Sequence, residues 1–370
     1  MKPSEVFFIN LRCKDGDSRL NKLERLIKEA GIGNIDFKGK FVAIKMHFGE
    51  PGNLAFLRAN YAATVVKIVQ QLGGKPFLTD CNTLYVGGRK NALDHIESAY
   101  KNGYMPYATG AHVIIADGLK GTDEVLVPVR NGEYVTEAKI GRAVMDADII
   151  ISLAHFKGHE GTGFGGALKN LGMGCGSRRG KMEMHSDGKP QIEESLCIKC
   201  GACIKICAHD APLITKETSH IDHDKCVGCG MCIGVCPTDA IQPGDSSSND
   251  KLNYKISEYT QAVCDGRPSF HINVVIDVSP NCDCHGENDL SIVPDVGLFA
   301  SFDPVALDRA CVEAVNAQPP IQGTQLTEGK KRNHGDNLDT NHPQTNWRSG
   351  LDHAEKIGLG TQRYKMIEVQ

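Results

Sequence analysis

Eight cysteines within 40 residues constrain this chain more than any other feature of its sequence. They form two runs, CIKCGACIKIC at 197–207 and CVGCGMCIGVCP at 226–237, each with the spacing C-x2-C-x2-C-x3-C. The runs repeat at an offset of 29 residues, and the repeat also matches Ile192 with Ile221, Asp210 with Asp239 and Ala211 with Ala240. Because the match extends beyond the cysteines, it indicates a duplicated structural unit. Closely spaced Cys-x-x-Cys pairs are typical of metal binding in a reducing compartment rather than of disulfides.

The two runs resemble the bacterial two-cluster ferredoxins over roughly residues 188–245. In that family the fourth cysteine of each run ligates the cluster of the other run. The resemblance implies one [4Fe–4S] cluster on Cys197, Cys200, Cys203 and Cys236, and a second on Cys226, Cys229, Cys232 and Cys207. Ala208 departs from the pattern, because the second run has Pro237 there, and this puts the turn after the last ligand in doubt. Paired zinc knuckles, which also use C-x2-C pairs, are the alternative.

Composition limits what the other 300 or so residues can be. The chain has 370 residues, 41% of them hydrophobic, which is enough for one large core or two modest ones. Its formal charge of -4 comes from nearly balanced acids and bases, so we expect no nucleic acid partner. No apolar run approaches the roughly 18 residues of a membrane span, and the N-terminus lacks a signal peptide. We therefore expect a cytoplasmic protein with no membrane partner.

Apolar segments alternate with helical patterns on both sides of the cysteine runs, which is the rhythm of βαβ units. Before the runs, strands are predicted at 5–11, 40–48, 76–80, 111–118 and 148–156, with helices at 19–31, 60–74, 91–103 and 137–147. After them come a helix at 251–263, strands at 270–279 and 296–301, and helices at 303–317 and 347–360, then a strand at 363–369. We predict an α/β fold, a doubly wound and mostly parallel sheet, with an inserted α+β two-[4Fe–4S] ferredoxin-like domain.

The domain boundaries follow from this pattern. Residues 1–187 form the first part of the α/β domain, 188–245 the insert, and 246–370 the second part. The ends of an insert must lie close together in space. The polar stretch at about 319–345 has little periodicity, so we expect a C-terminal arm that packs against another subunit of a homodimer.

Polar side chains gather where the predicted strands end, at the edge where open parallel sheets bind ligands. His155, Lys157 and His159 are the candidate catalytic residues. His47 and Asp80 follow two other strands, although each could equally cap a helix or satisfy a buried amide. We expect Asp303 to cap the helix that begins at Pro304.

A glycine-rich run, EGTGFGGALKNLGMGC at 160–175, follows these residues. Its Gly-x-Gly-x-x-Gly match does not predict a dinucleotide site, because no strand runs straight into it and Gly172 and Gly174 interrupt the helix after it. The run suits a small anionic ligand instead, since backbone N–H groups can approach a ligand closely here. The nearby positive charges are Lys157, Lys169, Arg178, Arg179 and Lys181. A tightly packed connection with solvated basic residues is the alternative.

A Cys-x-Cys pair, Cys282 and Cys284, follows the strand at 270–279 and points to the same edge. Such a pair can bind metal, form a strained disulfide, or lie as two buried thiols. We expect a third metal site made by Cys175, Cys282, Cys284 and His185, suited to iron, an iron–sulfur centre or zinc. Of the four remaining thiols, Cys81 follows the strand at 76–80, while Cys13, Cys264 and Cys311 lie in apolar contexts and are predicted to be core residues.

Taken together, the stretches KMHFGE, FLTDCNTLY, HFKGHEGTGFGGALKNLGMGCGSRRGKMEMH, PNCDC and VGLFASFDPVALD resemble the uncharacterised iron–sulfur centre proteins. That family is built on a domain of unknown function that carries an inserted two-cluster ferredoxin. The resemblance covers about 300 residues and implies a redox protein of an anaerobe, without a known reaction.

We therefore expect an iron–sulfur oxidoreductase in which two [4Fe–4S] clusters relay single electrons between a redox partner protein and a metal or ligand site at the sheet edge. Two other classes fit the same residues. One is an electron-transfer subunit of a larger redox complex, with no chemistry of its own. The other is an assembly factor for a metallocofactor, whose Cys-x-Cys metal would be labile.

Overall fold

The computed structural model describes residues 2–84, 87–186, 189–226, 231–238, 240–243, 249–328 and 335–370. Cys229 and Asp239 lie outside the described residues. An eight-stranded central sheet organises the chain, with the strand order β16-β1-β15-β14-β7-β2-β3-β4. The strands are β1 (Ser4–Asn10), β2 (Phe41–Lys45), β3 (Lys75–Asp80), β4 (Val113–Ile115), β7 (Ile149–His155), β14 (Ser269–Val275), β15 (Gly297–Ser301) and β16 (Tyr364–Glu368).

The sheet is mostly parallel, as predicted. β14, β7, β2, β3 and β4 all run the same way, and β15 runs against both of its neighbours. From β2 the chain moves outward to β3 and β4, then returns to place β7 and β14 on the other side of β2. The strand order therefore reverses beside β2, and the carboxyl ends of β2, β3, β7 and β14 meet at one edge.

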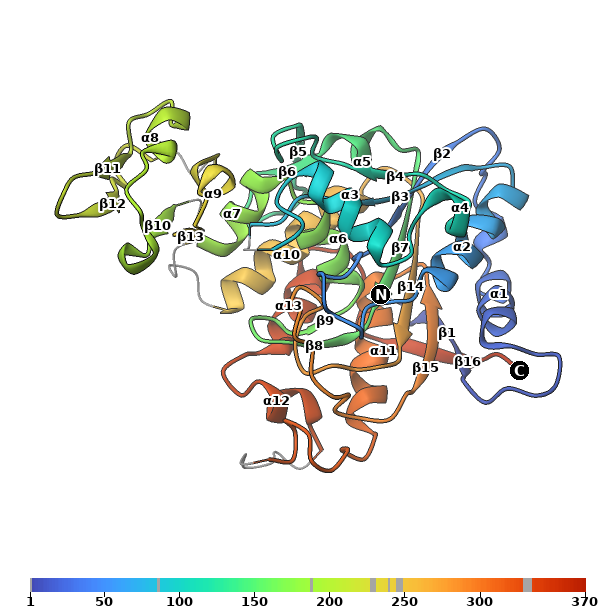
Figure 1. Cartoon of the computed structure of the whole chain (residues 1–370). Helices are drawn as coiled ribbons and strands as arrows, with labels where there is room; N and C mark the ends of the chain where they lie inside the picture. The colour runs from blue at the N-terminus through green and yellow to red at the C-terminus, as the bar shows by residue number, and fades with distance from the viewer. Residues whose placement is uncertain are drawn as a thin grey trace.

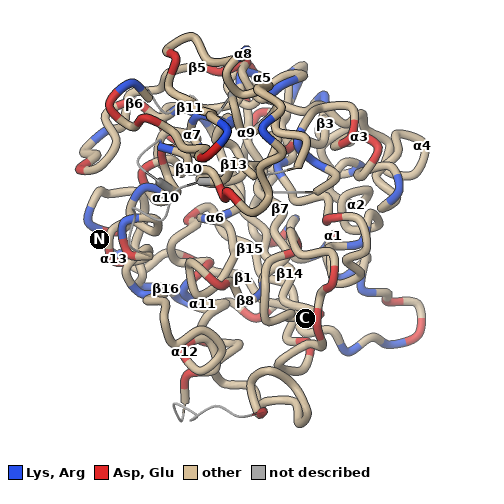
Figure 2. Tube along the Cα trace, turned by 60° about the vertical axis from the view of Figure 1, so that its left-hand side comes forward, with Lys and Arg blue, Asp and Glu red and all other residues tan. Residues whose placement is uncertain are grey.

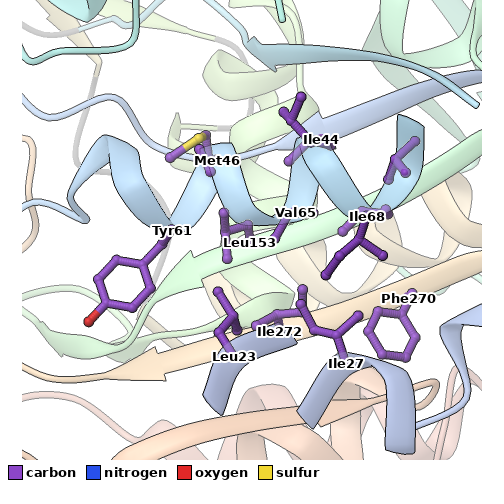
Figure 3. Packing of buried hydrophobic residues seen from close by; sticks show 14 of the residues in the cluster. Leu23, Ile27, Ile44, Met46, Tyr61, Val65, Ile68, Leu153, Phe270 and Ile272 are labelled. Atoms are coloured by element: carbon purple, nitrogen blue, oxygen red, sulfur yellow. The ribbon is translucent and has the colours of Figure 1, made fainter. Parts of the chain in front are cut away.

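Helices cover both faces of the sheet (Figure 1). One face carries α1 (Arg19–Glu29), α2 (Ala59–Gln71) and α3 (Ala92–Lys101), and Figure 3 shows side chains of α1 and α2 packed on those of the strands. The other face carries α5 (Arg142–Asp146), α6 (Ala167–Cys175), α10 (Asn249–Cys264), α11 (Pro304–Asn316) and α13 (Trp347–Lys356). Since β7 is buried along its whole length, it reads as one continuous apolar run with no alternation.

Local sequence sets several helix ends. Asp303 caps α11 as predicted, because its carboxylate accepts hydrogen bonds from the N–H groups of Val305 and Ala306. Asn91 caps α3 in the same way, and Ser18 caps α1. Short elements complete this part of the chain, namely the helices η1 (Ile32–Asn34), α4 (Pro106–Thr109) and α12 (Asn337–Asn341) and the hairpin of β8 (Lys157–His159) with β9 (Gly163–Gly165).

The structure corrects two predictions, for residues 137–147 and for Cys13, and it also shows where the described parts of 319–345 lie. The segment at 137–147 is not one helix, because β6 (Glu137–Gly141) pairs with β5 (Glu124–Pro128) before the short helix α5 begins. The described parts of 319–345 pack on this chain, because Leu326 and Leu338 are buried against α11. Cys13 is exposed rather than in the core, whereas Cys311 is buried as expected.

The cysteine-rich segment forms a small lobe beside α7 (Arg178–Ser186) and the start of α10 (Figure 1). Its elements are β10 (Pro190–Ile192), η2 (Glu194–Leu196), α8 (Ala202–Ile206), β11 (Pro212–Ile214), β12 (Ser219–Ile221), α9 (Met231–Val235) and β13 (Ile241–Pro243). β10, α8 and β11 recur 29 residues later as β12, α9 and β13, so the duplication in the sequence is also one of structure. β10 pairs with β13, which confirms that the two ends of this segment lie side by side.

The surface carries both signs of charge, with Lys and Arg interspersed among Asp and Glu along the trace (Figure 2). Several of these charges form exposed pairs, such as Lys101 with Glu97 at 2.7 Å. In the parts of the chain that the structure describes, no helix is both long enough and apolar enough to cross a bilayer.

Candidate functional site

A cleft opens at the carboxyl edge of the sheet, beside the strand β2 where the strand order reverses. It encloses about 50 Å³, whereas one water needs about 10–15 Å³ by the same measure, so it has room for a small ligand group. Its lining comes from the ends of four strands and from one face of α6. The lining residues are Lys45, His47, Asp80, Cys81, Thr83, Arg89, Lys157, Gly165, Gly166, Lys169, Asn170, Met173, Gly174, Lys181, Cys282 and Cys284.

Cys282 and Cys284 reach the cleft from one tight turn. The N–H of His285 donates to the carbonyl oxygen of Cys282 at 3.0 Å, which closes a four-residue turn around the pair. Both cysteines line the cleft, while the residue between them, Asp283, is fully buried beneath it. The turn therefore presents two thiols to one side and a carboxylate to the other.

Asp283 anchors this turn through buried charges. The carboxylate lies 2.9 and 3.0 Å from Nδ1 of His155, and 3.3 Å from Nζ of Lys157. Nε2 of His155 lies 2.8 Å from the carbonyl oxygen of Ile276, so both ring nitrogens face an oxygen acceptor. Burial would raise the pKa of Asp283, but His155 and Lys157 hold that pKa below its ordinary value. His155, a predicted catalytic residue, thus lies under the cleft and fixes its floor.

The neighbours of Cys282 favour the anionic form of its thiol. Nζ of Lys169 lies 3.7 Å from its Sγ. A hydrogen bond from Cys284 lowers the pKa of Cys282 well below its usual value, and Lys169 and His159 add to this effect against the cost of burial. Nδ1 of His159 accepts from the N–H groups of Gly161 and Thr162, so the proton of a neutral ring is on Nε2, the nitrogen free to donate to the thiolate.

Most other cations of the cleft have their own partners. Nζ of Lys45 lies 3.1 Å from Asp80, and Nε of Arg89 lies 2.7 Å from Glu50. A Cβ added at Gly174 would fall 2.3 Å from Nζ of Lys45, so a glycine is required there for the lysine to pass. Burial and Arg89 lower the pKa of His47 well below its usual value, and this imidazole is neutral.

The structure does not bring all four predicted third-site ligands together. Cys175 is buried on the face of α6 that also carries Leu171, four residues earlier, and both belong to the core cluster that includes Tyr259 of α10. It is absent from the lining of the cleft that holds Cys282 and Cys284. His185, on α7, is close enough to Lys169 for that charge, after burial, to help lower its pKa to about 3.

The basic residues near the glycine run separate into two groups. Lys157, Lys169 and Lys181 line the cleft, as expected for an anion site. Arg178 donates to the carbonyl oxygen of Lys90, and Arg179 pairs with Glu124 at 3.4 Å. These two arginines therefore connect parts of the scaffold.

One group of three potential metal ligands among the described residues has all its ligand atoms within 4.8 Å, namely Glu160, Cys284 and His285. Nε2 of His285 lies 3.1 Å from Glu160, and this hydrogen bond raises the pKa of His285 to about 9. A metal would have to displace that proton first, because only neutral imidazole binds metal. With this proton in place, Glu160 and His285 form an ion pair beside Cys284.

Four cysteines of the small lobe line a second cavity. They are Cys197, Cys200, Cys203 and Cys236, three from the first run and one from the second. Burial would raise the pKa of Cys236, but hydrogen bonds from backbone N–H groups, including that of Thr238, hold it below its usual value. In the other predicted set, Cys207 follows α8 directly, while Cys229 lies outside the described residues.

An apolar cluster joins this lobe to the wall of the cleft. Leu84, after β3, and Met182, on α7, are buried together with Cys203, Ile233 and Ile241 of the lobe. Their chain neighbours Thr83 and Lys181 line the cleft. The segments that carry Leu84 and Met182 therefore contact the lobe on one side and line the cleft on the other.

Two functional residues were missed at the level of sequence. Lys45 lies inside an apolar strand, and a lysine within such a buried parallel strand is a signal that a buried carboxylate faces it. Asp283 lies between two cysteines that line the cleft. In a Cys-x-Cys segment the middle side chain points away from the two thiols, and this could have identified Asp283 as the residue that anchors the turn.

The chain belongs to the family described as Domain of unknown function (DUF362), whose model matches residues 42–313 and so spans the cleft and the small lobe. A thylakoid-associated protein of Synechocystis sp. is 27% identical over 180 residues, which cover 46% of this chain and 50% of that protein. The chain thus spans about half the length of this curated relative.

Two solved structures are similar to this chain at a low level. The lactate racemase apoprotein from Thermoanaerobacterium thermosaccharolyticum has a TM-score of 0.43 and 12% identity, over 84% of this chain and 58% of that chain. A crystal structure of a protein from Thermotoga maritima has a TM-score of 0.41 and 14% identity, over 80% and 57%. Similarity of this degree says nothing about the chemistry of the cleft.

Proposed function

We propose that this protein is an iron–sulfur electron carrier in which two [4Fe–4S] clusters, held by an inserted ferredoxin-like lobe, exchange single electrons with the cleft of the α/β domain. The observation that carries the proposal is the apolar cluster of Leu84 and Met182 with Cys203, Ile233 and Ile241. Because Thr83 and Lys181 continue from this cluster into the cleft lining, a redox centre in the four-cysteine cavity would be close to the cleft.

The residues of the lobe fit two cubane clusters better than two zinc ions. The cavity lined by Cys197, Cys200, Cys203 and Cys236 combines three thiols of one run with the last thiol of the other, which is the crossed pattern of two-cluster ferredoxins. Zinc knuckles close each site with ligands that are neighbours in the chain. When bound, the clusters supply one-electron redox chemistry over a wide range of potentials, about -700 to +450 mV.

A protein redox partner fits the outer side of this lobe. Ile198 is an exposed apolar side chain that lines the four-cysteine cavity, and the exposed Leu196, Ile204 and Leu213 are chain neighbours of other lining residues. Exposed apolar residues clustered in this way mark interaction sites. This observation also favours the second candidate function, an electron-transfer subunit of a larger complex whose α/β domain only docks a partner.

The two candidate functions differ in whether the reduction potentials of the clusters change when a charge in the cleft is removed. In the Lys181→Met variant, a buried positive charge next to Met182 is lost, and this favours the oxidised state of a nearby cluster. We expect its potential to fall by an amount on the order of tens of millivolts in a potentiometric titration followed by electron paramagnetic resonance.

Lys101→Met is the matched control, because Lys101 is exposed on α3 and pairs with Glu97. It should leave both potentials unchanged. Equal potentials in the wild type and both variants would contradict coupling between the clusters and the cleft, and would favour the docking subunit.

A further inference from the structure

We propose that Cys282 and Cys284 form a thiol–disulfide exchange site, in which Cys282 attacks a small disulfide and Cys284 resolves the mixed disulfide. The geometry carries this assignment. The two thiols line one cleft from a single turn, which Asp283 anchors from beneath through His155 and Lys157. A bridge across one intervening residue is strained, and strained disulfides are the labile ones that take part in exchange.

The surroundings distinguish Cys282 from the other buried cysteines of the α/β domain. Lys169 lies 3.7 Å from its sulfur, and a hydrogen bond with His159 also lowers the pKa of Cys282. Cys175 and Cys311 are buried among apolar side chains and do not line the cleft, and burial raises the pKa of both thiols, as it does for Cys81 at the cleft wall. A thiolate is the nucleophile in exchange, so Cys282 is the attacking residue and the core thiols are inert.

The two cysteines and the disulfide substrate account for all the bonds, protons and electrons of the exchange. The Cys282 thiolate attacks R–S–S–R, forms Cys282–S–S–R and releases R–S⁻. Cys284 then gives up its proton and attacks the Cys282 sulfur, which closes the Cys282–Cys284 bridge and releases a second R–S⁻. The proton leaves on one of the released thiolates, and the substrate gains the two electrons that the pair loses.

The cleft favours anionic substrates. Once Cys282 is consumed in the bridge, Lys169 loses its anionic partner, and a released thiolate or a carboxylate can pair with it. Lys157 and Lys181 line the same space. The inference rests on the proposed function only for the return of electrons, because reopening the bridge needs two electrons and two one-electron clusters hold that number.

The test uses anaerobically purified full-length protein, treated with oxidised glutathione and digested with trypsin. Because Pro268 follows Arg267, trypsin leaves the peptide 256–309, which contains Cys264 as well as Cys282 and Cys284, so fragmentation of this peptide locates the bridge or the adduct. We expect a bridged peptide in the wild type, a glutathione adduct on Cys282 in Cys284→Ser, and neither product in Cys282→Ser. Cys13→Ser, at an exposed cysteine outside the cleft, should react as the wild type does.

Charge gives a second readout that does not depend on folding of the cysteine variants. Wild-type protein should form the bridge roughly tenfold faster with oxidised glutathione, which is anionic, than with cystamine, which is cationic. The proposal is overturned if the folded wild type forms no bridge, if the adduct forms on Cys284 in Cys282→Ser but not on Cys282 in Cys284→Ser, or if cystamine reacts faster. Iron and sulfide content of the same samples separates this failure from loss of the clusters.

Discussion

The α/β domain and the cysteine-rich lobe are stabilised in different ways. The domain has three extensive clusters of buried apolar side chains, on both faces of its sheet. In the described part of the lobe, the apolar cluster has five buried members, and two of these, Leu84 and Met182, come from the domain. A unit with so little apolar core needs disulfides, metal or a partner to fold. Folding of the lobe should therefore depend on the proposed iron–sulfur clusters, and folding of the α/β domain should not.

The largest expected effect is on the lobe. Cys200→Ser removes an exposed ligand from the four-cysteine cavity, so about half of the iron should be lost and the lobe should become sensitive to protease. Trp347 is the single tryptophan and is buried in the α/β domain, so its fluorescence should show an unchanged unfolding transition. Loss of both the lobe and the tryptophan transition would mean that the two regions fold as one unit.

The next effect should appear in the domain alone. Asp283→Ala leaves His155 and Lys157 buried without their carboxylate, which should lower the free energy of unfolding by about 3–5 kcal/mol. Urea unfolding followed by Trp347 fluorescence measures this change, and iron content should be preserved. Asp265→Ala, which removes an exposed partner of Arg130, is the control and should cost at most about 1 kcal/mol. Similar losses for the two variants would contradict a buried ionic anchor beneath the cleft.

A pH series should separate the regions further. Burial lowers the pKa of His271, on β14, from 6.5 to about 3. Between these two pH values the unfolded chain binds a proton at this histidine and the folded chain does not. Its contribution to stability is complete above pH 6.5 and is lost as the pH falls toward about 3. When the pH is lowered from about 7 to about 5, the free energy of unfolding should fall in both proteins. The fall should be smaller in His271→Asn than in the wild type, by up to about 2 kcal/mol. Equal losses would show that this histidine does not titrate with unfolding.

The smallest effect should come from the surface. Glu97→Gln breaks an exposed pair with Lys101, and we expect no measurable change in the free energy of unfolding, because solvent screens the pair. Iron content and the trypsin pattern should match those of the wild type. A measurable loss of stability would show that solvent does not screen this pair as it screens other exposed pairs.

These comparisons also show what a sequence can predict about such a protein. The mostly parallel sheet and the ligand edge were predictable, because apolar strands ended in polar residues at His47, Asp80, Lys157 and Cys282. The duplication was predictable because the cysteine spacing and its flanking residues repeat together, and the structure repeats at the same offset.

The parts that could not be predicted depend on contacts between distant segments. Residues 137–147 have a helical pattern, but pairing of β6 with β5 outweighs local preference there. The sequence places Cys175 at the end of the glycine-rich run, near the predicted edge that also holds Cys282. In the structure, Cys175 lies on the same face of α6 as Leu171, and both are buried in the core cluster with residues of α10. The pairing of Lys45 with Asp80 joins two strands, and no local pattern in either strand specifies it.

The most direct test of the account is the content of iron, zinc and acid-labile sulfide per chain, measured on anaerobically purified wild type beside the double variant Cys282→Ser/Cys284→Ser. The account predicts about eight irons and about eight sulfides in both proteins, with no zinc, because the two clusters lie in the lobe and Cys282 and Cys284 act as thiols. Zinc in place of iron would contradict the two clusters, and loss of metal in the double variant would make Cys282 and Cys284 metal ligands instead of an exchange pair.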